Sequence, residues 1–434
     1  MQPRSLLQAQ QQCGGLCLPG LYESGLLLRR KEILMNREME HINVLAGEIG
    51  YRVATTEGEH RAANYIEQEL HNYGLQEVRQ EAFRSPSEGV SGFFPYILAL
   101  IGSSLIAPLA PRLGLGGMLA SPALLIGELR SNRGPLTSLM QRGSSHNVIG
   151  VLPARGERKA RVVLMAHYDS VRVRNYMKPS QGKSPRRFLI PLMGLSYLTA
   201  LAAAAVGIFA RRKRNGALAR SARGVSSIAG ATLLAVTSPL LAGQLIPSFD
   251  GEGANDNASG VAVLLSLAEQ MAREGQSLEH TEVWFAGTGS EETGLRGAHA
   301  LVERHGKELK DAYFFAIDTV GAGRIHYTTQ ERFMQAGDVP HEVVDILVMA
   351  SEKGQHGAMP YILRAGGTDA SAMLGKRFKA ASICCLVKDG KWPEINWPTD
   401  VRRYVEAEQL PKVTAFVKDI LCEIDRRVCY NKAR

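Results

Sequence analysis

The chain has 434 residues, of which 45% are hydrophobic and 21% charged, with a formal net charge of +9. That length could bury one large core or two modest ones. Twelve Lys or Arg and no Asp or Glu fall within residues 171–249, so the rest of the chain carries a net charge of −3, which argues against a nucleic-acid partner for the molecule as a whole.

The chain begins with a Gln-rich leader that contains no long apolar run. A cleaved signal peptide needs such a run, so the leader is not expected to be one. Patterning typical of a folded domain starts near Met39. Residues 1–38 are therefore predicted to be an N-terminal extension.

The first regular element is predicted between Glu57 and Tyr73, where EGEHRAANYIEQELHNY has the spacing of an amphipathic helix. Gly74 follows, and glycine readily takes the left-handed conformation that ends a helix.

Uncharged stretches interrupt the chain twice. Each interruption consists of a pair of uncharged stretches, and the longer stretch of the first pair is 89–111. In the second pair, the stretch 188–210 has 23 residues and is flanked by basic residues on both sides, as expected for a helix that crosses a bilayer. We predict two inserted hydrophobic hairpins, at 89–128 and 171–249, that make the protein integral to a membrane. Buried core helices or an oligomer contact are the alternative, and the sequence leaves the oligomeric state open.

The arginines near the insertions bear on membrane sidedness. Arg84, Arg130 and Arg133 outnumber Arg112 around the first hairpin. For the second hairpin, the basic residues at 172–187 and those at 211–223 number six each. Because positively charged loops favour the cytoplasm, this balance favours a cytoplasmic catalytic domain.

Outside the insertions, helical and strand patterns alternate in the way an α/β sheet requires. A helix is predicted from Val261 to Arg273, and another begins after Pro340. Four short apolar runs are typical of buried strands: NVIGV at 147–151, VVLMA at 162–166, VWFA at 283–286 and FFAI at 314–317.

Chemistry-bearing residues follow these strands. His167 comes directly after VVLMA, Asp318 follows FFAI, and the adjacent Glu291 and Glu292 follow VWFA after a Gly-rich turn. Asp256 lies in a loop of small residues before a helix. Any one of these acids alone would be an ordinary solvated loop residue, but strand ends are where open α/β sheets build their sites. Imidazole and carboxylate are zinc ligands, so we predict a zinc site here.

At these residues the sequence resembles the co-catalytic zinc metallopeptidase family of leucyl aminopeptidases, glutamate carboxypeptidases and glutaminyl cyclases, which also includes the catalytically silent transferrin receptor. The resemblance rests on five motifs in the family's order: AHYDS at 166–170, GANDNASGVA at 253–262, SEETGLRG at 290–297, IDTVG at 317–321 and GGTDA at 366–370. It implies a three-layer α/β/α, phosphorylase/hydrolase-like mixed sheet with the hydrophobic hairpins inserted. The catalytic domain would comprise residues 39–88, 129–170 and 250–434.

The resemblance also implies roles for the motif residues. Asp256 would bridge two zinc ions, His167 and Asp318 would complete one metal, and Glu292 would help to hold the other. Glu291 would be the general base. Two further aspartates receive secondary roles: Asp169 would orient His167, and Asp369 would either line the substrate pocket or cap a helix.

One position departs from the family pattern. The family supplies its last ligand as a His four residues before an Asp, and NWPTD places Asn396 there, with Asp400 in register. An amide oxygen is a weaker zinc ligand than imidazole, so the resemblance implies one firmly bound Zn²⁺ and a weakened second one. Glutaminyl cyclase activity is disfavoured, because its single zinc rests on the missing His.

Two functions remain open. The first is a membrane-associated metallo-exopeptidase, most often an aminopeptidase in this family, that hydrolyses peptide substrates. The second is a catalytically reduced family member that acts as a binding or scaffold protein, which Asn396 favours.

Overall fold

The computed structural model describes residues 37–87, 89–131, 143–171, 186–245, 251–273, 275–331, 337–364, 366–387 and 399–430. The chain forms two compact units. The first unit comprises Met1–Glu88, Arg142–Arg172 and Asp250–Arg434, and the second comprises Gly89–Gln141 and Val173–Phe249.

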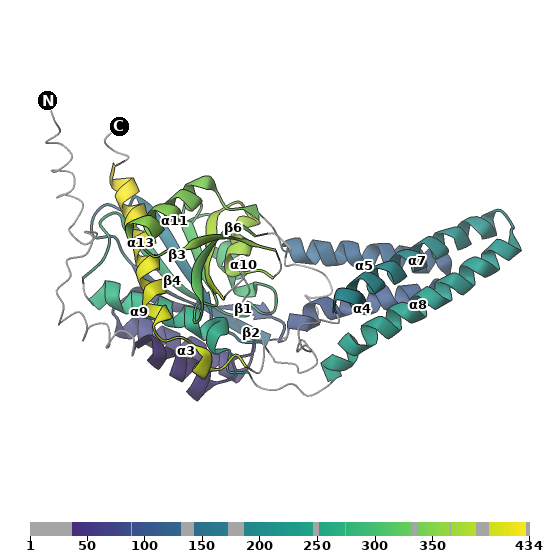
Figure 1. Ribbon diagram of the computed structural model, residues 1–434, viewed down its shortest axis with the longest axis horizontal. Helices are drawn as coiled ribbons and strands as arrows, with labels where there is room; N and C mark the ends of the chain where they lie inside the picture. The colour runs from purple at the N-terminus through teal and green to yellow at the C-terminus, as the bar shows by residue number, and fades with distance from the viewer. Residues whose placement is uncertain are drawn as a thin grey trace, which may run out of the picture. The chain divides into compact units, whose positions relative to one another are not determined.

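A mixed β-sheet runs through the first unit (Figure 1). Its strands within the described residues are β1 Gln76–Ser85, β2 Gly143–Leu152, β3 Ala160–His167, β4 Thr281–Thr288, β5 Tyr313–Ile317, β6 Arg324–Glu331, β7 Gly337–Asp338, β8 Met359–Leu363 and β9 Lys379–Leu386. They lie in the order β1-β2-β4-β3-β5-β9-β6-β7, and β8 pairs with β6. The four apolar runs of the sequence fall in β2, β3, β4 and β5, as predicted.

The central strands β4, β3, β5 and β9 are parallel to one another. Almost all of their residues are buried, which is why they are apolar without alternation. His167 at the end of β3 pairs with Thr288 at the end of β4. The carboxyl ends of these strands therefore meet at one edge of the sheet.

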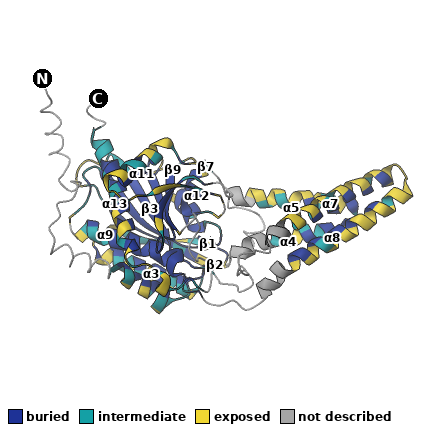
Figure 2. Cartoon of the chain, in the orientation of Figure 1, coloured by how far each residue is buried: buried dark blue, intermediate teal, exposed yellow. Residues whose placement is uncertain are grey.

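Two groups of helices cover the sheet. Helix α3 packs on α9, α9 on α13 and α13 on α11, while α10 and α12 pack together. Both groups contact the strands. Their bounds are α3 Glu57–Asn72, α9 Ser259–Arg273, α10 Arg296–His305, α11 His341–Lys353, α12 Asp369–Leu374 and α13 Gln409–Tyr430. Buried residues concentrate in the strands and on the inner faces of these helices (Figure 2). The predicted three-layer α/β/α class is confirmed.

Helix α3 shows how local sequence builds this layer. Its apolar residues Ala62, Ala63, Ile66 and Leu70 are fully buried, and burying an Ile or Leu side chain contributes about 1.5–3 kcal/mol. Gly74, with φ +83°, follows the helix end in the left-handed conformation, as the sequence predicts.

The second unit consists of two helical hairpins, in the two segments where the sequence predicts hydrophobic insertions. They comprise α4 Gly89–Ile106 with α5 Pro111–Ser131, and α7 Arg186–Arg212 with α8 Gly216–Leu245. Where the helices meet, small side chains allow close approach: a Cβ at Gly230 would lie 2.9 Å from the Ser104 carbonyl oxygen. The buried cluster is mostly alanine, comprising Ala107, Met118, Ala200, Ala204 and Ala229.

Large apolar side chains of the second unit point outward instead. Among the described residues, 17 of the 20 exposed large hydrophobic side chains belong to this unit, Leu109 and Ile228 being examples. Within the same residues, one helix, Pro191–Arg212, is long and apolar enough to cross a membrane, and only 28% of its most apolar window is buried. The core helix of a soluble unit is usually mostly buried, and this window is not.

Candidate metal centre

The carboxyl ends of β3 and β5 bring three predicted ligands together. The Nε2 atom of His167 lies 3.2 Å from Asp256 Oδ1 and 3.8 Å from Asp318 Oδ1. One donor atom from each of the three residues lies within 4.8 Å of the others, and all three side chains are buried. The structure thus places the three predicted ligands of one metal in one small volume.

Asp256 reaches this volume from the short helical turn η3 Ala254–Ala258, just before α9. The carboxylate of Asp400 accepts hydrogen bonds from the backbone N–H groups of Asn255 (2.7 Å) and Asp256 (3.1 Å). The Asn257 side chain donates to the Ile317 carbonyl oxygen (2.9 Å), next to Asp318. The loop that carries Asp256 is therefore tied to the strand that carries Asp318.

Glu291 and Glu292 lie in the turn after β4, where Ser290 takes a positive φ of 54°. The Asp169 carboxylate accepts the backbone N–H of Glu291 (2.9 Å) and that of Glu292 (3.1 Å). The same carboxylate lies 3.6 Å from Nδ1 of His167. Asp169 thus contacts both the imidazole and the backbone of the glutamate pair.

Charge is concentrated at this site. Burial is the main cause that raises the pKa of Glu291 and of Glu292 well above the usual carboxyl range, and the neighbouring carboxylates add to it. Burial lowers the pKa of His167, but Glu291 and the contacts to three aspartates outweigh it, so the net shift is upward. Each shift reflects buried negative charge that lacks compensation.

A divalent cation fits this donor set. The site offers one imidazole nitrogen and two carboxylate oxygens within reach of one ion, which are ligands that zinc prefers. Glu292 Oε1 is buried with no hydrogen-bond partner in the described residues. Buried carboxylates are stable when they pair with a cation or bind a metal, so a metal ion would relieve both conditions.

Asp369 lies at the start of α12, close to the same site. Its Oδ2 accepts a hydrogen bond from the Thr288 hydroxyl (2.5 Å), and its Oδ1 is buried without a partner among the described residues. Burial raises the pKa of Asp369 to about 7. Thr368 holds the N-cap position of α12, and its backbone N–H donates to the Ser371 hydroxyl (3.2 Å). The carboxylate of Asp369 is thus directed to the end of β4.

Sequence reasoning missed three residues that hold the site loops. Arg52 is fully buried and donates to five carbonyl oxygens, among them those of Tyr168 (2.8 Å) and Gly253 (2.9 Å). Glu59 Oε1 accepts the backbone N–H of Ser290 (2.9 Å). The sequence pattern identifies Asp400 only as the aspartate that is in register with the family motif.

A signal for Glu59 does exist in the sequence. Glu59 precedes Ala62, Ala63, Ile66 and Leu70 by three, four, seven and eleven residues, which places its carboxylate on the buried face of α3. A carboxylate on the buried face of a helix needs a hydrogen-bond partner that is also buried. Asn396, the predicted weak ligand, lies outside the described residues.

Comparison with known proteins supports the same assignment. Residues 238–414 match the model of Peptidase family M28. Within this segment the chain is similar to peptidase family M28. The expected metallo-exopeptidase class and its Zn²⁺ cofactor are confirmed with it. No curated protein is detectably similar in sequence.

Solved structures share the fold of this chain at low sequence identity. A zinc aminopeptidase from Bacillus subtilis has a TM-score of 0.54 and 16% identity, covering 90% of this chain and 95% of its own. The aminopeptidase from Aneurinibacillus sp. strain AM-1 has a TM-score of 0.51 and 18% identity, with coverage of 90% and 95%. A glutaminyl cyclase from Bacteroides thetaiotaomicron, bound to N-acetylhistamine, has a TM-score of 0.51 and 13% identity, with coverage of 89% and 96%.

Proposed function

We propose that this protein is a membrane-associated zinc aminopeptidase in which Glu291 is the general base. The observation that carries the proposal is the buried group of His167, Asp256 and Asp318, with Glu291 in electrostatic contact with His167. A scaffold protein would need none of these residues in this arrangement.

His167, Asp256 and Asp318 would hold one zinc ion, and Glu292 would extend towards a second. Bound zinc lowers the pKa of its water ligand towards about 7 and polarises the carbonyl of the scissile bond. The Glu291 carboxylate accepts a proton from the attacking water and passes it to the leaving amine.

The choice of amino-terminal rather than carboxy-terminal cleavage is supported by aminopeptidases among the similar solved structures, such as those from Bacillus subtilis and Aneurinibacillus.

The test of the base is the substitution Glu291→Gln. The amide keeps the shape of the side chain but cannot accept the proton, so turnover of an aminoacyl-anilide should fall about 10²–10⁴-fold while zinc stays bound. Glu408→Gln, at an exposed glutamate of the same unit, is the matched control and should retain parental turnover. Activity of Glu291→Gln within a few-fold of the parent would remove Glu291 from this role.

The scaffold alternative rests on Asn396 in place of the family's histidine. Zinc per chain, measured together with hydrolysis, separates the two functions. Bound zinc with turnover supports the enzyme, whereas a protein that neither retains zinc nor hydrolyses peptides would be the scaffold.

Membrane attachment is proposed through the second unit. Its support is the helix Pro191–Arg212 and the outward-facing leucines and isoleucines of all four helices. A soluble helical bundle buries its large apolar side chains, whereas this unit buries alanine and exposes the large ones. Lipid tails would remove that exposed apolar surface from water. The arginine balance around the first hairpin supports a cytoplasmic position for the first unit.

A further inference from the structure

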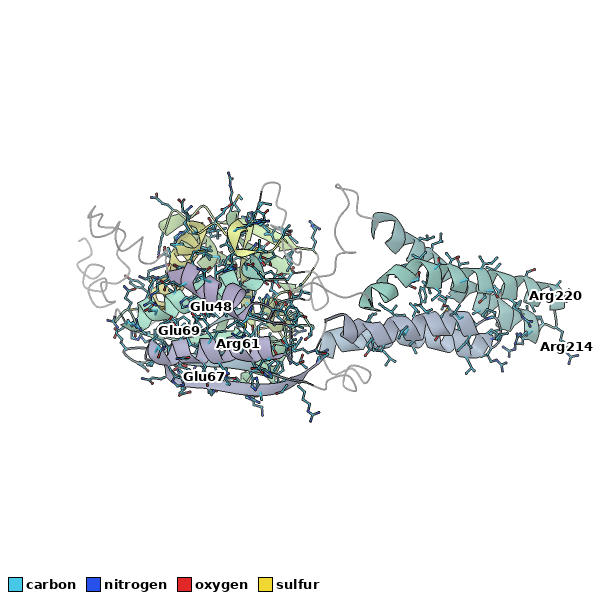
Figure 3. All side chains as sticks on the ribbon, turned by 90° about the horizontal axis from the view of Figure 1, so that it is seen from below. Glu48, Arg61, Glu67, Glu69, Arg214 and Arg220 are labelled. Carbon is cyan, nitrogen blue, oxygen red and sulfur yellow. The ribbon has the colours of Figure 1, made fainter. Side chains whose placement is uncertain are left out.

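The turn between α7 and α8 carries a dense group of cations, which we call the basic tip. Every side chain in the group is exposed, and Figure 3 shows Arg214 and Arg220 at this end of the hairpin. The basic tip consists of Arg211, Arg212, Lys213, Arg214, Arg220 and Arg223.

These charges are not compensated within their unit. Residues 89–141 contain one acid, Glu128, and residues 173–249 contain none. No ion pair to the basic tip occurs within the described part of the chain, and Arg211 donates only to the Leu109 carbonyl oxygen, at 3.5 Å. Six like charges at one end of the hairpin repel one another, so the tip favours a partner that is negatively charged.

Large apolar side chains surround the basic tip. Phe209 is 56% exposed one turn before the cations, and Leu218 and Val225 are exposed between and after them. The contact of Arg211 with Leu109 brings the α4–α5 turn alongside, where Leu109 is 77% and Leu113 73% exposed. The end of the bundle therefore presents cations and hydrophobic side chains together.

We propose that the basic tip binds the headgroups of anionic phospholipids. The arrangement matches a bilayer boundary, because arginine and lysine reach phosphate groups while the apolar stems and neighbours enter the acyl region. A nucleic acid would neutralise the cations but would leave Phe209, Leu109 and Leu113 in water. The inference rests on the proposed membrane association and adds the class of lipid that the protein selects.

The experiment uses the full-length protein in bilayer nanodiscs of equal phosphatidylcholine and phosphatidylglycerol. Phe209→Trp places a fluorophore beside the basic tip, and the bromine quencher is carried on the acyl chains of one lipid at a time. The parent, with its three native tryptophans, supplies the background. Brominated phosphatidylglycerol should quench the new tryptophan about twofold more than brominated phosphatidylcholine, and added salt should reduce the difference.

Two triple variants in the Phe209→Trp protein separate tip charge from total charge. Arg212→Gln with Lys213→Gln and Arg214→Gln should make quenching by the two lipids equal. Lys307→Gln with Lys310→Gln and Lys412→Gln removes the same charge from exposed positions of the first unit and should leave the preference unchanged.

The outcomes distinguish this inference from the function on which it rests. Equal quenching by both lipids in the Phe209→Trp protein overturns the anionic preference and leaves membrane association intact. Absence of quenching by either lipid overturns both. A short DNA duplex that binds the tip and abolishes the preference would assign the surface to nucleic acid instead.

Discussion

Arg52 donates its hydrogen bonds to carbonyl oxygens although Asp400, Asp169 and Asp256 are close enough to influence it. Burial lowers the pKa of Arg52 to about 10, which leaves the guanidinium charged at neutral pH. One side chain thereby fixes the loop after β3 and the loop before η3. Its positive charge also lowers the free-energy cost of burying the nearby carboxylates in their charged form.

Glu38 presents the opposite case, a buried carboxyl with little support. It is fully buried, its Oε1 accepts a hydrogen bond from the Thr414 hydroxyl (3.1 Å), and its Oε2 has no partner among the described residues. Burial raises the pKa of Glu38 to about 7.

The raised pKa gives a pH-dependent prediction. The unfolded chain releases the Glu38 proton near pH 4.5 and the folded chain near pH 7, so the contribution of Glu38 to stability is complete below about pH 4.5 and is lost as pH rises towards 7. Glu38→Gln mimics the protonated form. It should therefore remove about 1–3 kcal/mol of the decrease in unfolding free energy between pH 5 and pH 8.

Denaturant unfolding at the two pH values measures this effect in the metal-free protein. Glu40→Gln is the matched control, because Glu40 lies two residues away and is exposed. If both variants change with pH as the parent does, Glu38 is not the titrating group.

At the scale of elements, periodicity and strand ends were sufficient to predict much of the fold and the site. The predicted helix from Val261 to Arg273 corresponds to α9 Ser259–Arg273, and the helix after Pro340 corresponds to α11. His167 and Asp318 could be placed together because parallel strands share an edge.

The supports of the site loops could not be predicted in the same way. Arg52 contacts residues 116 and 201 positions away, at Tyr168 and Gly253. Asp400 holds an amide 145 positions away, at Asn255. Such contacts depend on tertiary packing rather than on any local pattern, so only Glu59, on the apolar face of α3, left a trace in the sequence.

The turn after β4 that contains Glu291 and Glu292 yields a second prediction. Asp169 accepts two adjacent backbone N–H groups, and Asp169→Asn would replace one acceptor oxygen by an N–H₂ that faces another donor. Turnover should fall about 10–100-fold, as is typical when a residue that supports metal ligands is changed.

Asp311→Asn, at an exposed aspartate, provides the control for the change of residue type. Kinetics and zinc content are measured on both variants. Loss of turnover in Asp169→Asn no greater than in Asp311→Asn would show that the turn does not depend on this carboxylate.

At the scale of the whole molecule, the two units bury different kinds of side chain. The first unit buries Phe314, Phe315, Phe416 and other large residues, whereas the buried cluster of the second unit is mostly alanine. A water-soluble unit gains stability by burying large apolar side chains, and the second unit leaves most of its own outside.

This contrast predicts the behaviour of the full chain during extraction. The protein should stay with membranes through an alkaline carbonate wash, because apolar helices are removed only by detergent. Replacing residues 172–249 by a Gly/Ser linker should release it, provided that the first hairpin does not span. Recovery of the full-length protein as a soluble species without detergent would contradict the proposal and favour an oligomer contact.

The position of β4 in the sheet sets an order of events during biosynthesis. β4 lies between β2 and β3, yet both of these strands are synthesised before it, and residues 173–249 emerge from the ribosome between β3 and β4. β2 and β3 therefore cannot pair with β4 until both hairpins have been synthesised. On the proposed attachment, insertion into the bilayer precedes closure of the sheet, and a nascent chain that stops before Asp318 is anchored but cannot form the metal centre.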